Sequence, residues 1–282
     1  MIVQRVAVVG TGLMGRGIAY AAALGGFETT LHDVSSAALE KALAQIRRDL
    51  DEGIARGKLQ PAEAAAALKR LAPVQDLDDE ADFVVEAAPE DMALKLRLFS
   101  RLDEVCRPEV VLASNTSGLS VTELAAATRR PARVAGMHFF NPVPKMKLVE
   151  IVRGLDTSDE TLAAVAAVAE RMGKESVVVR ESPGFVTSRI NAMIGNEAFY
   201  MLEAGVASAW DIDKALKLGL NHPMGPFELV DLVGLDTRLS VLEFLHKSLG
   251  EKYRPCPLLV QYVKAGRLGR KAGRGVYEYP AK

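Results

Sequence analysis

In the first 180 residues, hydrophobic positions alternate between short β-branched runs and longer stretches with helical spacing. Val3–Val9 and Phe27–His32 are predicted as strands joined by a glycine turn and an alanine-rich helix, a βαβ-like unit of about 30 residues. Further strands are predicted at Phe83–Val85, Val110–Ala113, Val134–Met137, Leu148–Val152 and Ser176–Val179, with helices at Asp91–Cys106 and Thr122–Ala127. This alternation predicts an α/β fold, a Rossmann-like, doubly wound and mostly parallel sheet with helices on both faces.

Two parts of the chain depart from this alternation. Residues 36–72 are too long for one crossover helix, and their glycines and proline predict an inserted helical hairpin. After the turn at Pro183–Gly184 the pattern becomes almost purely helical, as in Arg189–Gly205. We therefore expect a Rossmann-like α/β domain at 1–184 and an all-helical domain at 185–282.

Composition excludes several classes of protein without naming a function. The 282 residues include 35 Lys and Arg against 36 Asp and Glu, so nothing in the net charge of −1 favours nucleic acid or an anionic membrane as partner. The two cysteines, Cys106 and Cys256, form neither a disulfide framework nor a CxxC metal site, and we expect no metal. No apolar run approaches the roughly 18 residues that span a bilayer, and no signal peptide is apparent, so we expect a cytoplasmic protein.

A glycine-rich turn follows the first predicted strand. In such a turn Gly10 permits the tight bend, Gly12 lets a pyrophosphate approach the backbone, and Gly15 lets helix and strand pack closely. The helix that follows offers free N–H groups to phosphates. Asp33, at the end of the second strand, suits the ribose hydroxyls of NAD and repels the 2′-phosphate of NADP, although an acid there could also be an N-cap or turn residue.

Of the four histidines, His138 has the position most typical of a catalytic group. It ends a predicted strand and begins the stiff loop HFFNPVP, where open α/β sheets place their ligands. The other three fit packing, turn or surface positions: His32, His222 and His246.

Two polar features near the predicted strand ends leave alternatives open. Glu150 lies in the apolar run LVEIV, where it either partners a histidine inside the sheet or points outward into solvent. Residues 114–117, SNTS, follow another strand and could bind a substrate oxygen or cap the next helix. Capping needs only one of these side chains, so four in a row favour a site.

Together these residues closely resemble the L-3-hydroxyacyl-CoA dehydrogenase family, in particular its bacterial 3-hydroxybutyryl-CoA dehydrogenase branch. The resemblance runs from the first strand almost to the C-terminus. Its motifs are Gly10–Gly15, Val85–Glu90, Ser114–Ser117, His138–Pro144, Pro183–Phe185 and Asn221–Pro226. The glycine motif is generic to dinucleotide folds, whereas the HFFNPVP run and its spacing to Glu150 are specific.

The resemblance implies a role for each matching residue. His138 would be the general base for the C3 hydroxyl of a 3-hydroxyacyl-CoA, oriented by Glu150, while Ser117 would hydrogen-bond the substrate oxygen. The implied cofactor-lining positions are Gly10, Gly12, Leu13, Met14, Gly15, Asp33, Glu90, Lys95, Ser117 and Asn141. Asn141 would also lie near substrate, and Arg56 and Lys58 on the hairpin become candidates for the phosphates of CoA.

One position departs from the family pattern. Many members carry Asn after the Pro-Gly-Phe motif as a further ligand of the substrate oxygen, whereas this chain has Ser188. Serine reaches less far, and Asn191, one helical turn on, could compensate.

The resemblance further implies NAD as cofactor, an acyl-CoA substrate and a homodimer formed through the C-terminal domain. Apolar residues there, such as Phe199 and Phe227, are either the interface or the core of the domain. Two other functions stay open at this point: a sugar-acid dehydrogenase of the L-gulonate type, or a non-catalytic NAD-binding protein.

Overall fold

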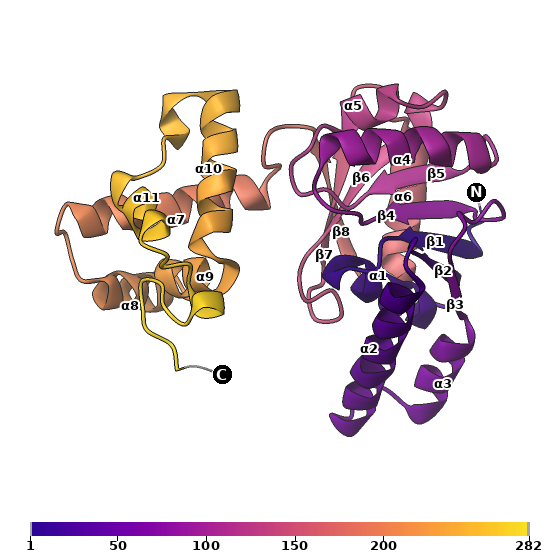
Figure 1. Cartoon of the computed structure of the whole chain (residues 1–282), viewed down its shortest axis with the longest axis horizontal. Helices are drawn as coiled ribbons and strands as arrows, with labels where there is room; N and C mark the ends of the chain where they lie inside the picture. The colour runs from indigo at the N-terminus through magenta and orange to yellow at the C-terminus, as the bar shows by residue number, and fades with distance from the viewer. Residues whose placement is uncertain (1, 281–282) are drawn as a thin grey trace. The chain divides into compact units, whose positions relative to one another are not determined.

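The computed structural model describes residues 2–280 and divides the chain into two compact units, Met1–Ser182 and Pro183–Lys282 (Figure 1). Residue 1 and residues 281–282, which the expected domains include, lie outside the described part. The division falls two residues before Gly184, where the sequence pattern placed it.

One mixed β-sheet organises the first unit. Its strand order, across the described residues, is β3-β2-β1-β4-β5-β6-β7-β8. Neighbouring strands are parallel except β6 and β7, which are antiparallel. The strands are β1 Arg5–Val9, β2 Glu28–His32, β3 Leu71–Val74, β4 Phe83–Glu86, β5 Val111–Ser114, β6 Val134–Phe139, β7 Leu148–Arg153 and β8 Glu175–Arg180. The strand order reverses between β1 and β4. The crevice at the carboxyl ends of these two strands is therefore the topological switch point, where such sheets bind ligands.

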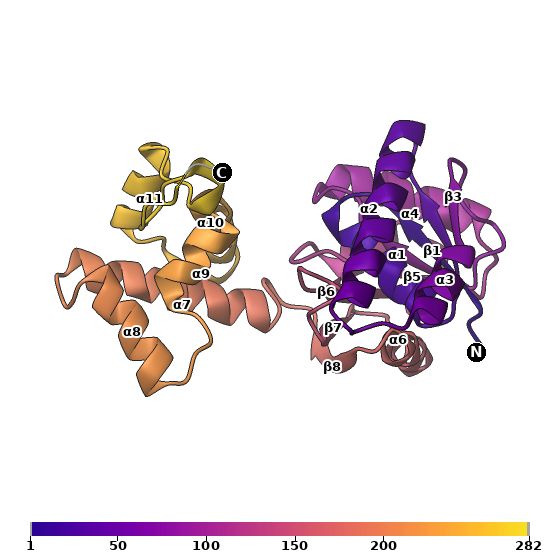
Figure 2. The same cartoon turned by 90° about the horizontal axis from the view of Figure 1, so that it is seen from below.

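Helices cover both faces of this sheet (Figures 1 and 2). One face carries the main hydrophobic core, in which Val85, Ala113 and Met137 pack with apolar residues of α1 and α6. On the other face α5 packs on β6 and α4 packs on α5. The helices of this unit are α1 Leu13–Leu24, α2 Ser36–Ala55, α3 Pro61–Lys69, α4 Met92–Val105, α5 Val121–Ala126 and α6 Asp159–Arg171, with a short 3-10 turn, η1, at Pro131–Arg133. The doubly wound fold predicted from the hydrophobic pattern is confirmed.

Strand register places four polar residues of β4 to β7 on one face of the sheet. Glu86 pairs with Ser114, and Ser114 pairs with Gly136. Two residues further along β6, His138 pairs with Glu150 of β7. Because paired residues share a face and side chains alternate along a strand, all of these point to the side of α4 and α5.

The inserted hairpin forms as expected, but it ends earlier. Helices α2 and α3 account for residues 36–69, whereas the expected hairpin continued to residue 72. Instead, Leu71–Val74 form β3, which pairs in parallel with β2 at the edge of the sheet. Pro73 lacks an N–H, and an edge strand is one of the few places in a sheet where that loss is tolerated.

The second unit is a helical bundle with its own core. Phe199 and Phe227 pack edge to face with their ring centroids 5.2 Å apart, and Leu242 and Leu245 complete the buried centre. Its elements are α7 Thr187–Glu203, α8 Ala209–Gly219, α9 Pro226–Val233, α10 Leu235–Leu249, η2 Glu251–Tyr253, α11 Pro257–Lys264 and η3 Arg270–Ala272. Phe199 and Phe227 are thus core residues of this domain.

Candidate active site

The glycine turn after β1 has the geometry that a bound dinucleotide needs. Gly10 has a positive φ of 107°, and a side chain there would meet the Ala87 carbonyl oxygen at 2.7 Å. A Cβ on Gly15 would lie 1.9 Å from the Gly10 oxygen, so helix α1 can pack against the turn only without one. Gly12, by contrast, faces open space, and no side chain caps the first turn of α1. The helix N–H groups are therefore available to phosphates.

Asp33 is tied to the glycine turn by Thr11. One carboxylate oxygen accepts hydrogen bonds from the Thr11 hydroxyl at 2.6 Å and the Thr11 N–H at 3.2 Å, and the other accepts from the Ser35 N–H at 3.1 Å. Burial alone would raise the pKa of Asp33, but these hydrogen bonds outweigh it and hold the pKa below its usual value. Asp33 therefore stays ionised beside the glycine turn. The N-cap of α2 is Ser35, so Asp33 is not the cap, whereas its hydrogen bond from the Ser35 N–H, two residues on, is that of a turn residue.

His138 and Glu150 form a buried pair across β6 and β7. The His138 Nδ1 lies 2.8 Å from the Glu150 Oε2, and Glu150 has no exposed surface. The inward alternative for Glu150 is the correct one. Because the carboxylate accepts a hydrogen bond from Nδ1–H, it favours the tautomer in which Nε2 keeps its lone pair and can act as a base.

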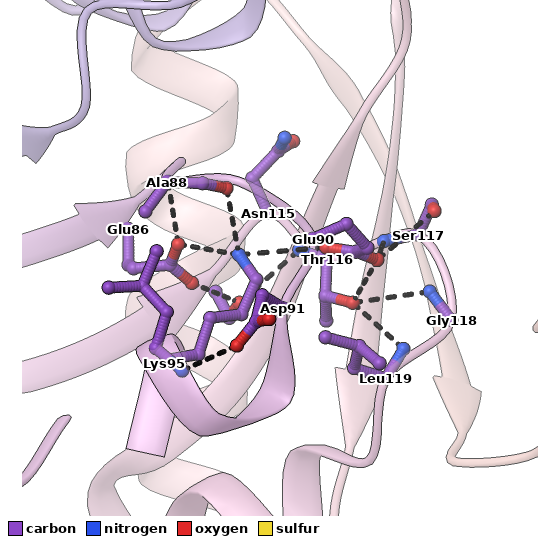
Figure 3. A network of polar contacts seen from close by, with 12 residues as sticks. Glu86, Ala88, Glu90, Asp91, Lys95, Asn115, Thr116, Ser117, Gly118 and Leu119 are labelled. Atoms are coloured by element: carbon purple, nitrogen blue, oxygen red, sulfur yellow. Dashed lines mark hydrogen bonds and ion pairs between the residues drawn. The ribbon is translucent and has the colours of Figure 1, made fainter. Parts of the chain in front are cut away.

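A second buried ion pair lies where β4 ends (Figure 3). Glu86 has no exposed surface and accepts hydrogen bonds from the Lys95 ammonium at 2.5 Å, the Ser114 hydroxyl at 2.5 Å and the Ala88 N–H at 2.7 Å. Lys95, on α4, is 1% exposed. Three donors, one of which is the counterion Lys95, offset the cost of burying this carboxylate.

The four residues of the SNTS segment differ in their hydrogen-bond partners and in their exposure. Ser114 is buried on Glu86, and Asn115 accepts a hydrogen bond from the Phe139 N–H at 2.9 Å, which ties the end of β5 to the residue after His138. Ser117 alone of the four is exposed. The cap of α5 is Ser120, so the capping alternative for these four residues is wrong.

Glu90 holds Thr116 and Ser117 together. Its Oε1 accepts hydrogen bonds from the Thr116 hydroxyl at 2.6 Å, the Ser117 N–H at 2.9 Å and the Ser117 hydroxyl at 3.2 Å (Figure 3). The Thr116 oxygen in turn accepts from two N–H groups of the loop that follows. The Glu90 carboxylate therefore holds the loop after β5 in place.

A cavity of about 650 Å³ brings the two hairpin cations together with Asn141. It lies among α1, α2, the loop after β6 and the turn after α6. Its charged lining residues are Arg16, Arg56, Lys58, Lys145 and Lys174 against Asp49 and Glu52. Five cations against two carboxylates make this a site suited to anions, although the chain as a whole is almost neutral.

The remaining candidates belong to α7, to the end of α10 and to β2. Ser188 and Asn191 are half-buried in the first turns of α7, in the second unit. His246 pairs with Glu251 near the surface, at 3.1 Å from Nε2. His32 is buried in β2, and burial lowers its pKa.

Thr11 and Glu86 are site residues that sequence reasoning missed. Glu86 carries a signal similar to that of Glu150, a carboxylate within an apolar strand run, and that signal could have identified it. Thr11 lies inside the glycine motif and has no signal of its own.

Within residues 2–280, no group of three or more His, Cys, Asp or Glu side chains is arranged to hold a metal ion. Nor is any helix in that range long and apolar enough to cross a bilayer.

A doubly wound sheet with a dinucleotide turn at its switch point and a carboxylate-oriented histidine on a neighbouring strand defines an NAD-dependent oxidoreductase. The chain belongs to the 3-hydroxyacyl-CoA dehydrogenase family. The NAD-binding domain of that family matches residues 5–182, and its C-terminal domain matches residues 184–279.

Named relatives support the same assignment over the full length. A probable 3-hydroxybutyryl-CoA dehydrogenase of Bacillus subtilis (strain 168) is 50% identical, over 100% of this chain and 99% of that protein. A 3-hydroxyadipyl-CoA dehydrogenase of Escherichia coli (strain K12) is 43% identical, over 99% of this chain and 60% of that protein. The crystal structure of (S)-3-hydroxybutyryl-CoA dehydrogenase from Ralstonia eutropha superposes with a TM-score of 0.97 at 47% identity, covering 99% of this chain and 100% of that one.

The position of Asp33 makes a prediction about cofactor choice. Replacing Asp33 with Ser removes the charge that repels a 2′-phosphate, so the preference for NADH over NADPH in kcat/KM should fall by about ten- to a hundredfold. Steady-state kinetics with both cofactors measure this preference. Asp51→Ser, which removes an exposed carboxylate on α2, should leave it unchanged. An unaltered preference in Asp33→Ser would contradict the assigned role.

Proposed function

We propose that this protein catalyses the reversible oxidation of (S)-3-hydroxybutyryl-CoA to 3-oxobutyryl-CoA with NAD. The observation that carries the proposal is the buried His138–Glu150 pair, which lies on the same sheet as the dinucleotide turn. The full-length similarity to 3-hydroxybutyryl-CoA dehydrogenases supports the choice of acyl group.

The chemistry needs a base for the C3 hydroxyl and a donor for the oxygen that becomes a carbonyl. His138 Nε2 takes the hydroxyl proton, and Glu150 stabilises the imidazolium that forms. The exposed Ser117 hydroxyl donates to the substrate oxygen, with Asn141 as a further polar group of the site. Bound NAD supplies the acceptor for the hydride that leaves C3. In the reverse direction His138 returns the proton.

The dyad can be tested with 3-oxobutyryl-CoA and NADH. His138→Ala should lower kcat by on the order of a hundred- to ten-thousandfold, because the proton then has no positioned donor. Glu150→Gln should lower kcat less, by about ten- to a hundredfold, because an amide orients the imidazole without stabilising its charge. His246→Ala, which alters a near-surface histidine, serves as the control.

Near wild-type turnover in His138→Ala would show that the mechanism is wrong. A panel that adds L-gulonate and 3-hydroxyadipyl-CoA tests the substrate itself. Activity on gulonate and none on any CoA thioester would favour a sugar-acid dehydrogenase, and tight NADH binding without any turnover would favour a non-catalytic protein.

We propose that the basic cavity receives the phosphates of CoA. Arg56 and Lys58 lie on its wall, and the excess of cations there supports an anionic occupant. Arg56 is already paired with Glu52 at 2.9 Å on an exposed surface, which holds its guanidinium in place at little cost.

Removal of the two hairpin charges should weaken substrate binding and spare the chemistry. In the double variant Arg56→Ala, Lys58→Ala, KM for 3-oxobutyryl-CoA should rise roughly tenfold while kcat stays near wild type. KM for 3-oxobutyryl-pantetheine, which lacks the nucleotide phosphates, should not change. Lys41→Ala, at an exposed position elsewhere on α2, is the matched control. An equal rise in KM for both substrates would overturn this assignment.

We also propose that the protein is a homodimer joined through its helical domain. That domain exposes several large apolar side chains: Val206, Trp210, Leu218, Leu220, Leu232 and Val233. Trp210 is 63% exposed, and apolar groups of this kind on a soluble domain are typical of an interface.

Sedimentation of the full chain tests the dimer. Wild type should sediment at twice the mass of one chain, and the double variant Trp210→Glu, Leu218→Asp should sediment as a monomer. Val34→Asp, at an apolar position exposed in the first domain, should leave the mass unchanged. A monomeric wild type at micromolar concentration would contradict the proposal.

We place this activity in the cytoplasm and in fatty-acid metabolism. The free, buried Cys106 and Cys256 are suited to a reducing compartment, and a 3-hydroxyacyl-CoA is a thioester of a fatty acid.

A further inference from the structure

Ser117 has one hydroxyl proton, and in this structure that proton is directed at Glu90. A carboxylate can only accept, so the 3.2 Å contact is a donation from Ser117. The oxygen of a 3-oxoacyl group also only accepts. Ser117 therefore cannot bind that oxygen until it leaves Glu90.

The three hydrogen bonds to Glu90 Oε1 differ in a way that permits this exchange. Those from the Thr116 hydroxyl, at 2.6 Å, and from the Ser117 N–H, at 2.9 Å, are shorter than the one from the Ser117 hydroxyl. The longest bond can open by rotation of a single side chain. The two shorter bonds then still hold the backbone of the loop.

Lys95 supports Glu90 from inside the domain. Its ammonium lies 3.6 Å from Glu90 Oε2, 2.5 Å from Glu86 and 3.2 Å from the Ala88 carbonyl oxygen (Figure 3). At 1% exposure, this side chain is covered by protein. A cation at this distance draws negative charge away from the Oε1 atom that Ser117 must leave, which makes Oε1 a weaker competitor for the hydroxyl proton.

We propose that Glu90 is a positioning residue that delivers the Ser117 hydroxyl to the substrate oxygen, and that Lys95 acts through Glu90. This inference rests on the proposed function, since it takes the substrate oxygen to be that of a 3-oxoacyl-CoA. Glu90 fixes the loop through Thr116 and the Ser117 N–H, and between turnovers it accepts the hydrogen bond of the Ser117 hydroxyl. Lys95, with Glu86 as its buried counterion, weakens the hydrogen bond between the Ser117 hydroxyl and Glu90, so that the hydroxyl can exchange Glu90 for the substrate oxygen.

A double-mutant cycle between Glu90 and Ser117 tests the proposal. Ser117→Ala removes a donor to the developing charge and should lower kcat by about a hundredfold. Glu90→Ala leaves the loop unheld and should lower kcat by on the order of tenfold, because misplacement of a donor weakens it. If Glu90 acts through Ser117, adding Glu90→Ala to Ser117→Ala should change kcat by less than about twofold.

Two further measurements separate positioning from cofactor binding and from damage to the fold. Because Glu90 is also expected to line the cofactor site, kcat is measured at NADH concentrations that saturate each variant, so that a change in the Kd for NADH does not contribute to the fall in kcat. Glu90→Gln keeps an oxygen that can accept from the Thr116 hydroxyl and the Ser117 N–H, so it should recover most of the lost kcat. Glu104→Gln, which removes an exposed carboxylate further along α4, is the matched control.

For Lys95, the charge must be removed together with that of Glu86, because Glu86 alone would be buried without a counterion. The double variant Glu86→Gln, Lys95→Met should lower kcat at saturating NADH by about three- to tenfold, and it should add little to Ser117→Ala. Wild-type kcat in this folded variant would overturn the part assigned to Lys95. If the variant does not fold, the Glu90 cycle still decides the main claim.

Additive losses in the Glu90 and Ser117 cycle, measured at saturating NADH, would overturn the proposal, as would a Glu90→Gln variant that recovers none of the lost kcat. Both results require a wild-type enzyme that reduces 3-oxobutyryl-CoA. Absence of that activity would instead contradict the proposed function, so the two failures are distinct.

Discussion

The requirement that a buried carboxylate must have a partner governs the arrangement of this site. Glu86 and Glu150 both lie on the face of the sheet toward α4 and α5, and neither is exposed to solvent. They meet the requirement with different chemistry. Glu86 is offset by Lys95, an ammonium group, whereas Glu150 is paired with His138, an imidazole that can take up and release a proton. The first pair builds a fixed support, and the second is able to carry a proton.

The extent to which sequence predicted this structure follows the range of the interactions involved. The glycine turn was predictable because its main constraints are local: Gly10 has a positive φ, and a side chain on Gly15 would meet the Gly10 oxygen of the same βαβ unit. The direction of Glu150 was not, because an apolar flank is compatible with either face. Its orientation is decided by antiparallel register with β6, a pairing of strands that no local pattern encodes.

The same reasoning explains the two residues that were missed and the strand that was not expected. Glu86 meets Lys95 only because α4 folds back along the strand, and Thr11 meets Asp33 only because β1 and β2 are neighbours. Strand β3 contains proline and follows a helix directly, so its sequence resembles the end of a hairpin. Only the vacant edge beside β2 makes it a strand. The near-neutral charge of the whole chain likewise gave no sign of the basic cavity, because a local excess of cations is balanced elsewhere.

The location of the acid–base pair across two strands has a consequence for the stability of the active state. His138 and Glu150 belong to strands joined through a loop, and their contact exists only while the ladder between β6 and β7 is closed. Loosening the base therefore requires opening hydrogen bonds in the interior of the sheet, which belongs to the most cooperative part of a domain. Inactivation and unfolding of this half of the sheet become a single event. The catalytic centre is in this sense as rigid as the core that carries it, and any adaptability towards substrates has to come from the loops around it.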